Sequence, residues 1–188
     1  VIFFTFLIYI ICILIKINRC YLLSFESNNY QLKKQESCQK LKIINHQKVD
    51  LDQNGNQECI ELKNKKITVK SNNEIIWQSN DDWQIDQFNI DDINNDTKEE
   101  LILSVWKQGS FDSHLPFWIE RNDERIENHL FIYNLQDGKI QSVWHSSRLV
   151  NPIRFFDVYD IDADGKNELI VLEGEYGWPR WFPARYIN

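Results

Sequence analysis

"DIDADGKNELIVLEG", residues 160–174, decides the fold, because it joins an acidic turn directly to an apolar, strand-like run. Its first, third, fifth and ninth positions carry carboxylates, which are Asp160, Asp162, Asp164 and Glu168. Carboxylates this close together repel one another unless a positive charge lies among them. The stretch therefore predicts a strand that begins at a turn and a cation held by that turn.

The same pattern occurs twice more along the chain. "DLDQNGNQECIEL" begins at Asp50, and "DINNDTKEELILSVW" begins at Asp92. Counted from the first Asp, each copy has Asp or Asn at positions 1, 3 and 5, Glu at position 9, and then an apolar run. A pattern that recurs at fixed positions indicates a repeat architecture.

A strand is also expected before each loop. Phe88 and Phe156 lie four residues before the first Asp of their loops, and Ile90 and Val158 lie two residues before it. This alternation is typical of a strand that enters the loop. The first repeat has polar residues at both positions, so we expect it to be an edge or a degenerate unit.

The segments between the loops repeat as well. Residues 66–79 and 130–146 each read as strand, turn, strand, with Asp137-Gly138 as the second turn. Each unit then has four strands, and the first occupies the 42 residues from Asp50 to Asp92. We therefore predict an all-β fold of four-stranded β-propeller-type blades. The second unit is longer, which predicts an insertion at 107–129.

The loops carry the ligand types that Ca²⁺ prefers, namely hard oxygens at alternating positions followed by a tight turn. Gly55 and Gly165 at position 6 permit a positive φ. Thr97 occupies that position in the second loop, at a cost on the order of 1 kcal/mol. The third loop has four carboxylates and glycine, so we expect it to bind Ca²⁺ best.

Two alternatives to this metal site remain to be weighed. The loops can be Asp/Asn-rich turns that cap strands and bind no ion. The first loop alone also fits an EF-hand, with Glu61 at position 12. The other two loops have Leu103 and Val171 there, and no helical pattern flanks any loop. The EF-hand is therefore rejected.

The two clearest repeats, at 88–102 and 156–170, share Phe-x-x-x-Asp-x-Asp/Asn-x-Asp followed by Glu-Leu-Ile. This pattern resembles the FG-GAP and VCBS repeat families, which include the propeller of integrin α-subunits, over about residues 40–175. The resemblance implies an extracytoplasmic β-propeller module with Ca²⁺ in its loops and faces that bind proteins or glycans. It implies these Ca²⁺ ligands: Asp50, Asp52, Asn54, Glu58, Asp92, Asn94, Asp96, Glu100, Asp160, Asp162, Asp164 and Glu168.

Propellers of these families usually have six or seven blades, whereas this chain holds two full units and the start of a third. We therefore expect a partial propeller or a fragment of a larger one. A partial stack of sheets leaves open edges, which invite pairing with a second copy of the chain.

The N-terminal end has a different composition. Residues 1–15 are apolar apart from one Thr, which suits a signal peptide, while a spanning helix needs about 20 residues. We expect a hydrophobic helix at 1–23 that is a signal peptide or a membrane anchor, a linker at 24–39, and the repeats at 40–188. The net charge of −7 argues against a general nucleic-acid-binding surface.

Function is expected in two aromatic loops, because aromatic faces stack on sugar rings and anchor interfaces. The predicted protein- or glycan-binding residues are Phe111, His114, Trp118, Tyr176, Trp178 and Trp181. The alternative is that these aromatics only cover apolar surface at the ends of the blades.

Catalysis is weakly motivated. Asp112 with His114, or Glu120 with Asp123, can be written as acid–base pairs. No nucleophile motif, phosphate-binding loop or HExxH accompanies them. We therefore expect a binding or adhesion module and not an enzyme. An accessory or catalytic domain acting on surface polysaccharide, or a purely structural fragment, is the alternative.

Overall fold

The structure is a computed structural model that describes residues 20–26, 29–35, 44–111, 117–118, 120 and 123–177, with the backbone alone before residue 44. These residues form twelve β-strands and no helix, so the predicted all-β class is confirmed. The chain divides into two compact units. One contains residues 41–92 and 96–152, and the other contains 1–40, 93–95 and 153–188.

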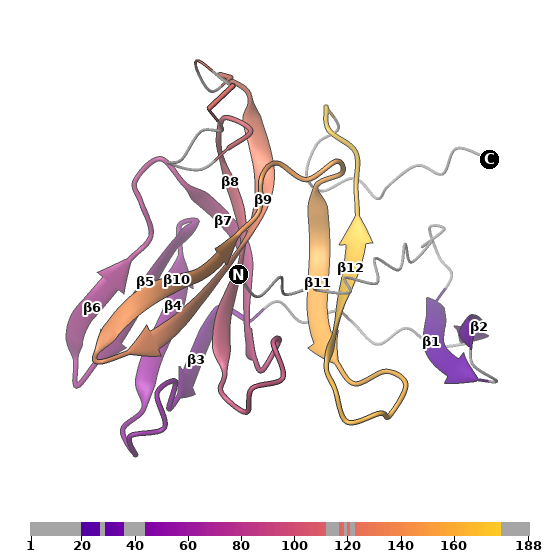
Figure 1. Ribbon diagram of the computed structural model, residues 1–188, viewed down its shortest axis with the longest axis horizontal. Helices are drawn as coiled ribbons and strands as arrows, with labels where there is room; N and C mark the ends of the chain where they lie inside the picture. The colour runs from indigo at the N-terminus through magenta and orange to yellow at the C-terminus, as the bar shows by residue number, and fades with distance from the viewer. Residues whose placement is uncertain are drawn as a thin grey trace. The chain divides into compact units, whose positions relative to one another are not determined.

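The unit built on residues 41–152 contains two four-stranded antiparallel sheets, in which each strand pairs with the next along the chain (Figure 1). The first sheet has the order β3-β4-β5-β6, with β3 His46–Val49, β4 Glu58–Lys63, β5 Lys66–Ser71 and β6 Glu74–Gln78. The second has the order β10-β9-β8-β7, with β7 Gln84–Asp91, β8 Glu100–Gln108, β9 Ile126–Gln136 and β10 Lys139–His145. Four-stranded sheets are therefore confirmed, but their bounds differ by one strand from the prediction, because the predicted unit at 50–92 contains β4, β5 and β6 of the first sheet and β7 of the second.

Two-residue turns join the later strands of both sheets. Positive φ at both turn residues matches the twist of a β-hairpin, and Asn, Asp and Gly adopt it at low cost. The turn residues with positive φ are Asn64 and Lys65, Asn72 and Asn73, and Asp137 and Gly138. The turns predicted within 66–79 and at Asp137-Gly138 are thus confirmed.

The two sheets of this unit pack face to face around a shared apolar core. The core includes Ile60 and Val69 from the first sheet and Phe88 and Phe131 from the second. Every residue of β8 from position 100 to 107 is buried, so both faces of the second sheet are covered. The core holds the ends of these strands, and therefore the acidic loops between them, in place.

The first repeat differs from the other two in the burial of the strand that precedes its acidic loop. Phe88 and Phe156, which precede the second and third loops, are both fully buried. In β3 the equivalent residue, His46, is exposed, and Val49 is half-buried on the opposite face of the strand. β3 and β7 are both outermost strands of their sheets, so this position does not distinguish the first repeat, and an edge or degenerate unit stays a prediction.

The other unit contains two two-stranded antiparallel sheets. β11 Ile153–Tyr159 pairs with β12 Glu168–Glu173, and β1 Cys20–Glu26 pairs with β2 Asn29–Gln35. β11 and β12 flank the third acidic loop as β7 and β8 flank the second. The third repeat therefore begins as the others do, with two strands in the described part of the chain.

The predicted domain boundaries shift in two places. β8 extends to Gln108 and β9 begins at Ile126, so the segment between them is 109–125 and is shorter at both ends than the expected insertion. The expected linker at 24–39 contains part of β1 and all of β2. Of the expected N-terminal helix, residues 1–19 lie outside the described residues, and 20–23 fall in β1. In the described part, no helix is long and apolar enough to cross a membrane.

Candidate functional site

The three acidic loops occupy the same place in their repeats. They connect β3 to β4, β7 to β8, and β11 to β12, which are the first two strands of each unit. Each loop ends with its ninth residue, a glutamate, as the first residue of the following strand. All the ligand positions expected from the sequence therefore lie in one type of strand–loop–strand unit.

The loops share one backbone conformation. The fourth and sixth residues of every loop have a positive φ. At position 4 the values are 58° for Gln53, 61° for Asn95 and 59° for Ala163, and at position 6 they are 91° for Gly55, 76° for Thr97 and 84° for Gly165. The positive φ expected at position 6 is confirmed, including at Thr97. A β-branched residue is strained in this region, so the second loop is held against an intrinsic preference.

The aspartate at position 1 organises each loop through its two carboxylate oxygens. Asp160 accepts a hydrogen bond from the backbone N–H of Asp164 at 3.1 Å and another from Gly165 at 2.9 Å. Asp50 and Asp92 accept the same two bonds, at 3.0 and 2.7 Å in each loop. Because one carboxylate accepts hydrogen bonds from two backbone amides, the turn is stabilised without a bound ion.

The residue at position 5 caps the second half of the loop. Asn54, Asp96 and Asp164 each accept a hydrogen bond from the backbone N–H two residues further on, at 2.8 Å in the first loop and 2.9 Å in the other two. One side-chain oxygen of each residue is therefore engaged in a local turn.

The glutamate at position 9 turns back toward the start of its loop. Glu58 accepts from the backbone N–H of Leu51 at 3.1 Å and from the Ser71 hydroxyl at 3.0 Å, and only 1% of its surface is exposed. Glu168 accepts from the backbone N–H of Ile161 at 2.9 Å. A buried carboxylate is costly unless it is paired with a positive charge. Among the described residues, the partners of Glu58 are neutral donors, so a bound cation would compensate it.

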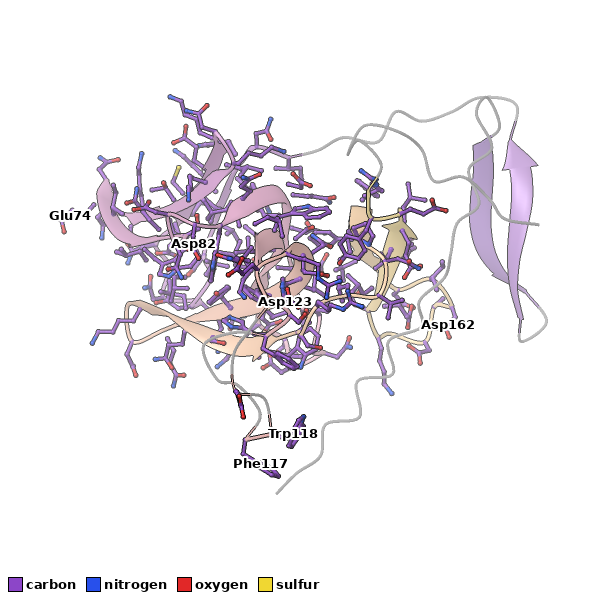
Figure 2. The ribbon with its side chains drawn as sticks, turned by 90° about the horizontal axis from the view of Figure 1, so that it is seen from above. Glu74, Asp82, Phe117, Trp118, Asp123 and Asp162 are labelled. Carbon is purple, nitrogen blue, oxygen red and sulfur yellow. The ribbon has the colours of Figure 1, made fainter. Side chains whose placement is uncertain are left out.

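Two of the loops gather carboxylate oxygens within 4.8 Å of one another. The groups are Asp50, Asp52 and Glu58 in the first loop and Asp160, Asp162 and Glu168 in the third. Figure 2 labels Asp162 on the loop between β11 and β12. Carboxylate oxygens in such a group are suitable ligands for a hard divalent cation, so the residues fit the expected ion. In the second loop position 3 is an asparagine, which leaves that loop three carboxylates in all.

Carboxylates of the loops raise the pKa of glutamates near them. Burial raises the pKa of Glu168, and repulsion from Asp162, Asp160 and Asp164 raises it further, against the opposing effect of the Ile161 hydrogen bond. Burial also raises the pKa of Glu99, with added repulsion from Asp91 and Asp50. Since Asp50 belongs to the first loop and Glu99 to the second, the charge of one loop acts on the other.

Side chains at position 4 make contacts that the sequence pattern did not reveal. The Gln53 amide donates to the Thr97 carbonyl at 2.7 Å, which links the first loop to the second. The Asn95 side-chain carbonyl accepts from the backbone N–H of Asn167 at 2.7 Å. Position 4 differs in all three repeats, so the repeat pattern gave no signal. The sequence signal that could have predicted these contacts is the amide side chain at position 4 in two of the loops, Gln53 and Asn95.

The predicted ligand-binding residues are partly described. Phe117 and Trp118 lie in the segment between β8 and β9, are 95% and 68% exposed, and form an edge-to-face pair with ring centroids 4.7 Å apart (Figure 2). Phe111 is half-buried in the same segment, and Tyr176 is half-buried in a turn of the other unit. The remaining three, His114, Trp178 and Trp181, lie outside the described residues.

The base of this segment is tied by polar contacts. The Gly109 N–H donates to the Arg125 carbonyl at 2.9 Å, and Asp123 accepts hydrogen bonds from the Ser110 hydroxyl and from Arg125. The Ser110 hydrogen bond, aided by Arg125, lowers the pKa of Asp123. Asp123, the acid–base candidate paired with Glu120 in the sequence, therefore makes hydrogen bonds at the base of this segment. Asp112 lies outside the described residues.

The strain at position 6 generates a paired prediction. Replacing Thr97 by Gly should raise the free energy of unfolding by about 0.5–1 kcal/mol, because relief of backbone strain exceeds the added entropy of the unfolded chain. The reverse change, Gly55→Thr, should lower the free energy of unfolding by a similar amount, because it introduces the same backbone strain. A steric clash should not add to this loss, since no atom lies within 4 Å of a Cβ built at Gly55. Urea denaturation measures both. A loss of stability in Thr97→Gly would contradict the strain argument.

Comparison with known proteins adds no relative from which a function can be transferred. The chain matches no protein-family model, no curated protein and no solved structure. The resemblance to the FG-GAP and VCBS families therefore stays a prediction that rests on the loop residues. The site is defined by what the chain itself shows, which is three acidic loops of one conformation at equivalent places in their repeats.

Proposed function

We propose that this protein is a calcium-binding repeat domain in which ions in the acidic loops stabilise the strand–loop–strand units. The observation that carries the proposal is the gathering of three carboxylates in each of two loops, with a buried or half-buried glutamate in each group. The shared backbone conformation supports it, because the two loops that gather carboxylates have the same turn. A hard divalent cation would offset charges that the described side chains leave uncompensated.

The third loop is the principal site in this proposal. Asp160, Asp162 and Glu168 would hold the ion through carboxylate oxygens, and Asp164 would add negative charge beside them. The chemistry that Ca²⁺ supplies is charge compensation and a many-oxygen shell, for which flexible carboxylate geometry is sufficient. The aspartate at position 1 also shapes the backbone of the loop, so it has a role in both the metal-free and the bound state.

Removal of the ion should lower stability. At a Ca²⁺ concentration 100 times the dissociation constant, one site adds about 2.7 kcal/mol, which for a chain of this size raises Tm by roughly 5–10 °C relative to EDTA. The double variant Asp52→Asn/Asp162→Asn should lose most of this rise. Glu74→Gln/Asp82→Asn is the matched control, because both residues are exposed and lie outside the loops (Figure 2). Equal Tm values for the unaltered protein in Ca²⁺ and EDTA would exclude the proposal.

Glu168 allows a test in which one substitution should stabilise the metal-free protein and destabilise the Ca²⁺-bound protein. The pKa of Glu168 is raised in the folded state. Its contribution to the stability of the metal-free protein is therefore fully present below the ordinary glutamate pKa, where the carboxyl is protonated. That stability is lost as the pH rises through the raised folded-state value.

Glu168→Gln should therefore increase the stability of the EDTA-treated protein at pH 7 and have little effect at pH 4. In saturating Ca²⁺ at pH 7 the same substitution should decrease stability, because a ligand is lost. Chemical denaturation under the three conditions measures this. A substitution that is destabilising in EDTA and in Ca²⁺ alike at pH 7 would indicate a purely structural glutamate.

The propeller architecture and the cellular location are part of the same proposal. We infer that the two four-stranded sheets are propeller-type blades of the FG-GAP or VCBS kind and that β11 and β12 begin a third. Their support is the repeated order of strands around the acidic loops. An extracytoplasmic location, with the N-terminal segment as signal or anchor, would suit weak calcium sites of the sort found in extracellular modules.

A second proposed function is ligand binding by the Phe117–Trp118 pair. The pair places two exposed aromatic rings in contact, and edge-to-face aromatic rings offer flat surfaces to sugars or peptides. The pair lies in the segment that interrupts the second repeat, which is where an insertion usually carries function.

Binding of a glycan array by the full chain tests this function. Phe117→Ala and Trp118→Ala should each reduce binding at least tenfold, since a buried aromatic anchor contributes about 2 kcal/mol or more. Tyr159→Ala is the control, because Tyr159 is an exposed aromatic residue on another strand. Equal binding by all three variants would remove the aromatic pair from the interface. Turnover of a bound polysaccharide in a parallel hydrolysis assay would favour the catalytic alternative.

A further inference from the structure

A fully buried histidine lies at the base of the segment 109–125. His129 belongs to β9, and none of its surface is exposed. Its Nε2 lies 3.0 Å from the carbonyl oxygen of Gly109, and its Nδ1 lies 3.2 Å from the carbonyl oxygen of Ser146. The imidazole ring therefore lies between the start of the segment, directly after β8, and the start of the chain that follows β10.

The two contacts of this ring require different numbers of protons. A carbonyl oxygen can only accept a hydrogen bond, whereas a neutral imidazole has a single N–H. In the neutral form, one ring nitrogen therefore presents a lone pair to a carbonyl oxygen, and only one of the two contacts is a hydrogen bond. The imidazolium has an N–H on each nitrogen, so protonation of His129 makes both contacts hydrogen bonds.

The charged groups around His129 are of both signs. Glu127 lies two residues earlier on the same face of β9 and favours the imidazolium, while Lys107, opposite Glu127 on β8, disfavours it. Glu127 is also ion-paired with Arg125 and Arg148, at 3.3 and 3.1 Å. The other titratable groups on the described elements around this end of β9 are Asp123, His145 on β10, and the exposed Asp81 and Asp82 beside the buried Trp83. Burial and the cations thus oppose protonation, whereas Glu127 and the two carbonyl oxygens favour it.

The two carbonyl partners of His129 are held in different ways. Ser146 is fixed to β9, because its N–H donates to the Leu130 carbonyl at 3.0 Å and its hydroxyl accepts from the Leu130 N–H at 2.9 Å. The Gly109 N–H bonds to the carbonyl of Arg125, at the other end of the same segment. A hydrogen bond from His129 to Gly109 therefore ties the segment to a point that the sheet already holds.

We propose that His129 is a pH-sensitive clamp that ties the segment 109–125 to the sheet by two hydrogen bonds when it is protonated and by one when it is neutral. Histidine ordinarily changes its charge between about pH 5 and 8. The second hydrogen bond is therefore present on the acidic side of this range and is lost as the pH rises. The clamp depends only on the contacts at the base of the segment.

The clamp would regulate ligand binding, a consequence that rests on the proposed function of the Phe117–Trp118 pair. The segment that His129 clamps is the one that carries this pair. Ordering its base before binding reduces the entropy lost on binding. Acidification should therefore tighten ligand binding, by about the factor of threefold to tenfold that one hydrogen bond corresponds to at most.

The protonation of His129 can be measured directly in the unaltered full chain. The imidazole ¹⁵N chemical shifts of His129, followed by NMR from about pH 4.5 to about pH 8.5, should show an N–H on both nitrogens at the acidic end and on one at the basic end. A ring that keeps one protonation state across the whole range would overturn the clamp. This measurement needs no variant, so it holds even where a substitution at this buried position impairs folding.

Hydrogen exchange measures the effect of the proton on the base of the segment. After correction for the intrinsic pH dependence of exchange, the Gly109 and Arg148 amides should be protected about threefold or more at about pH 5.5 relative to about pH 7.5. His129→Gln should abolish this difference, because glutamine does not titrate. His46→Gln is the matched control, since His46 is an exposed histidine on β3, and it should retain the difference. Equal protection at both pH values in the unaltered protein would refute the clamp.

Glycan binding at the same two pH values separates the clamp from the binding function. The unaltered chain should bind about threefold or more tightly at the lower pH, and His129→Gln should bind equally at both. Binding of equal strength at both pH values in the unaltered chain would refute the regulation and leave the binding function standing. The absence of binding at either pH, with a pH-dependent protection of Gly109, would refute the binding function and leave the clamp standing.

Discussion

The hydrogen bonds accepted by the position-1 aspartate are the constraint on which the rest of the structure depends. In each loop one carboxylate holds two consecutive backbone amides, and this places the residues at positions 4 and 6 in the left-handed region. The turn that results returns the chain in register for an antiparallel strand, as the pairing of Tyr159 with Glu168 illustrates. Because the same turn occurs three times, local hydrogen bonds divide the chain into equivalent strand–loop–strand units.

This constraint creates an electrostatic conflict. The turn that starts the second strand also places a glutamate at its first residue, and in two repeats that glutamate, Glu58 or Glu100, is 1% exposed. Half-buried or exposed carboxylates lie in the same loop, so folding brings further negative charge near the buried glutamate. A bound cation is the simplest compensation. The same ion would then stabilise the turn, the glutamate and the start of the strand together.

The part of the fold that local chemistry dictates was predictable from the sequence. The acidic loops, the strands on either side and the two-residue turns follow from spacing and turn residues, such as Asp137-Gly138. The polar residues of β3 indicated that the first repeat would differ, and His46 is indeed exposed, although it has the same pairing register as Phe88. The Gln53–Thr97 contact was not predictable, since it joins two loops that only tertiary packing brings together. The bounds of the segment 109–125 were not predictable either, because they depend on how far β8 and β9 remain paired.

The segment 109–125, which carries the exposed Phe117–Trp118 pair, is anchored at its base to the second sheet. At the base of the segment, the Gly109 N–H bonds to Arg125, and the Gly109 carbonyl lies 3.0 Å from the ring of His129, which is fully buried in β9. The backbone of Arg148, after β10, donates to the Ser110 carbonyl at 2.7 Å. Three segments of the second sheet therefore fix the two ends of the loop. If the aromatic pair binds a ligand as proposed, a fixed base would reduce the entropy lost on binding relative to a free chain.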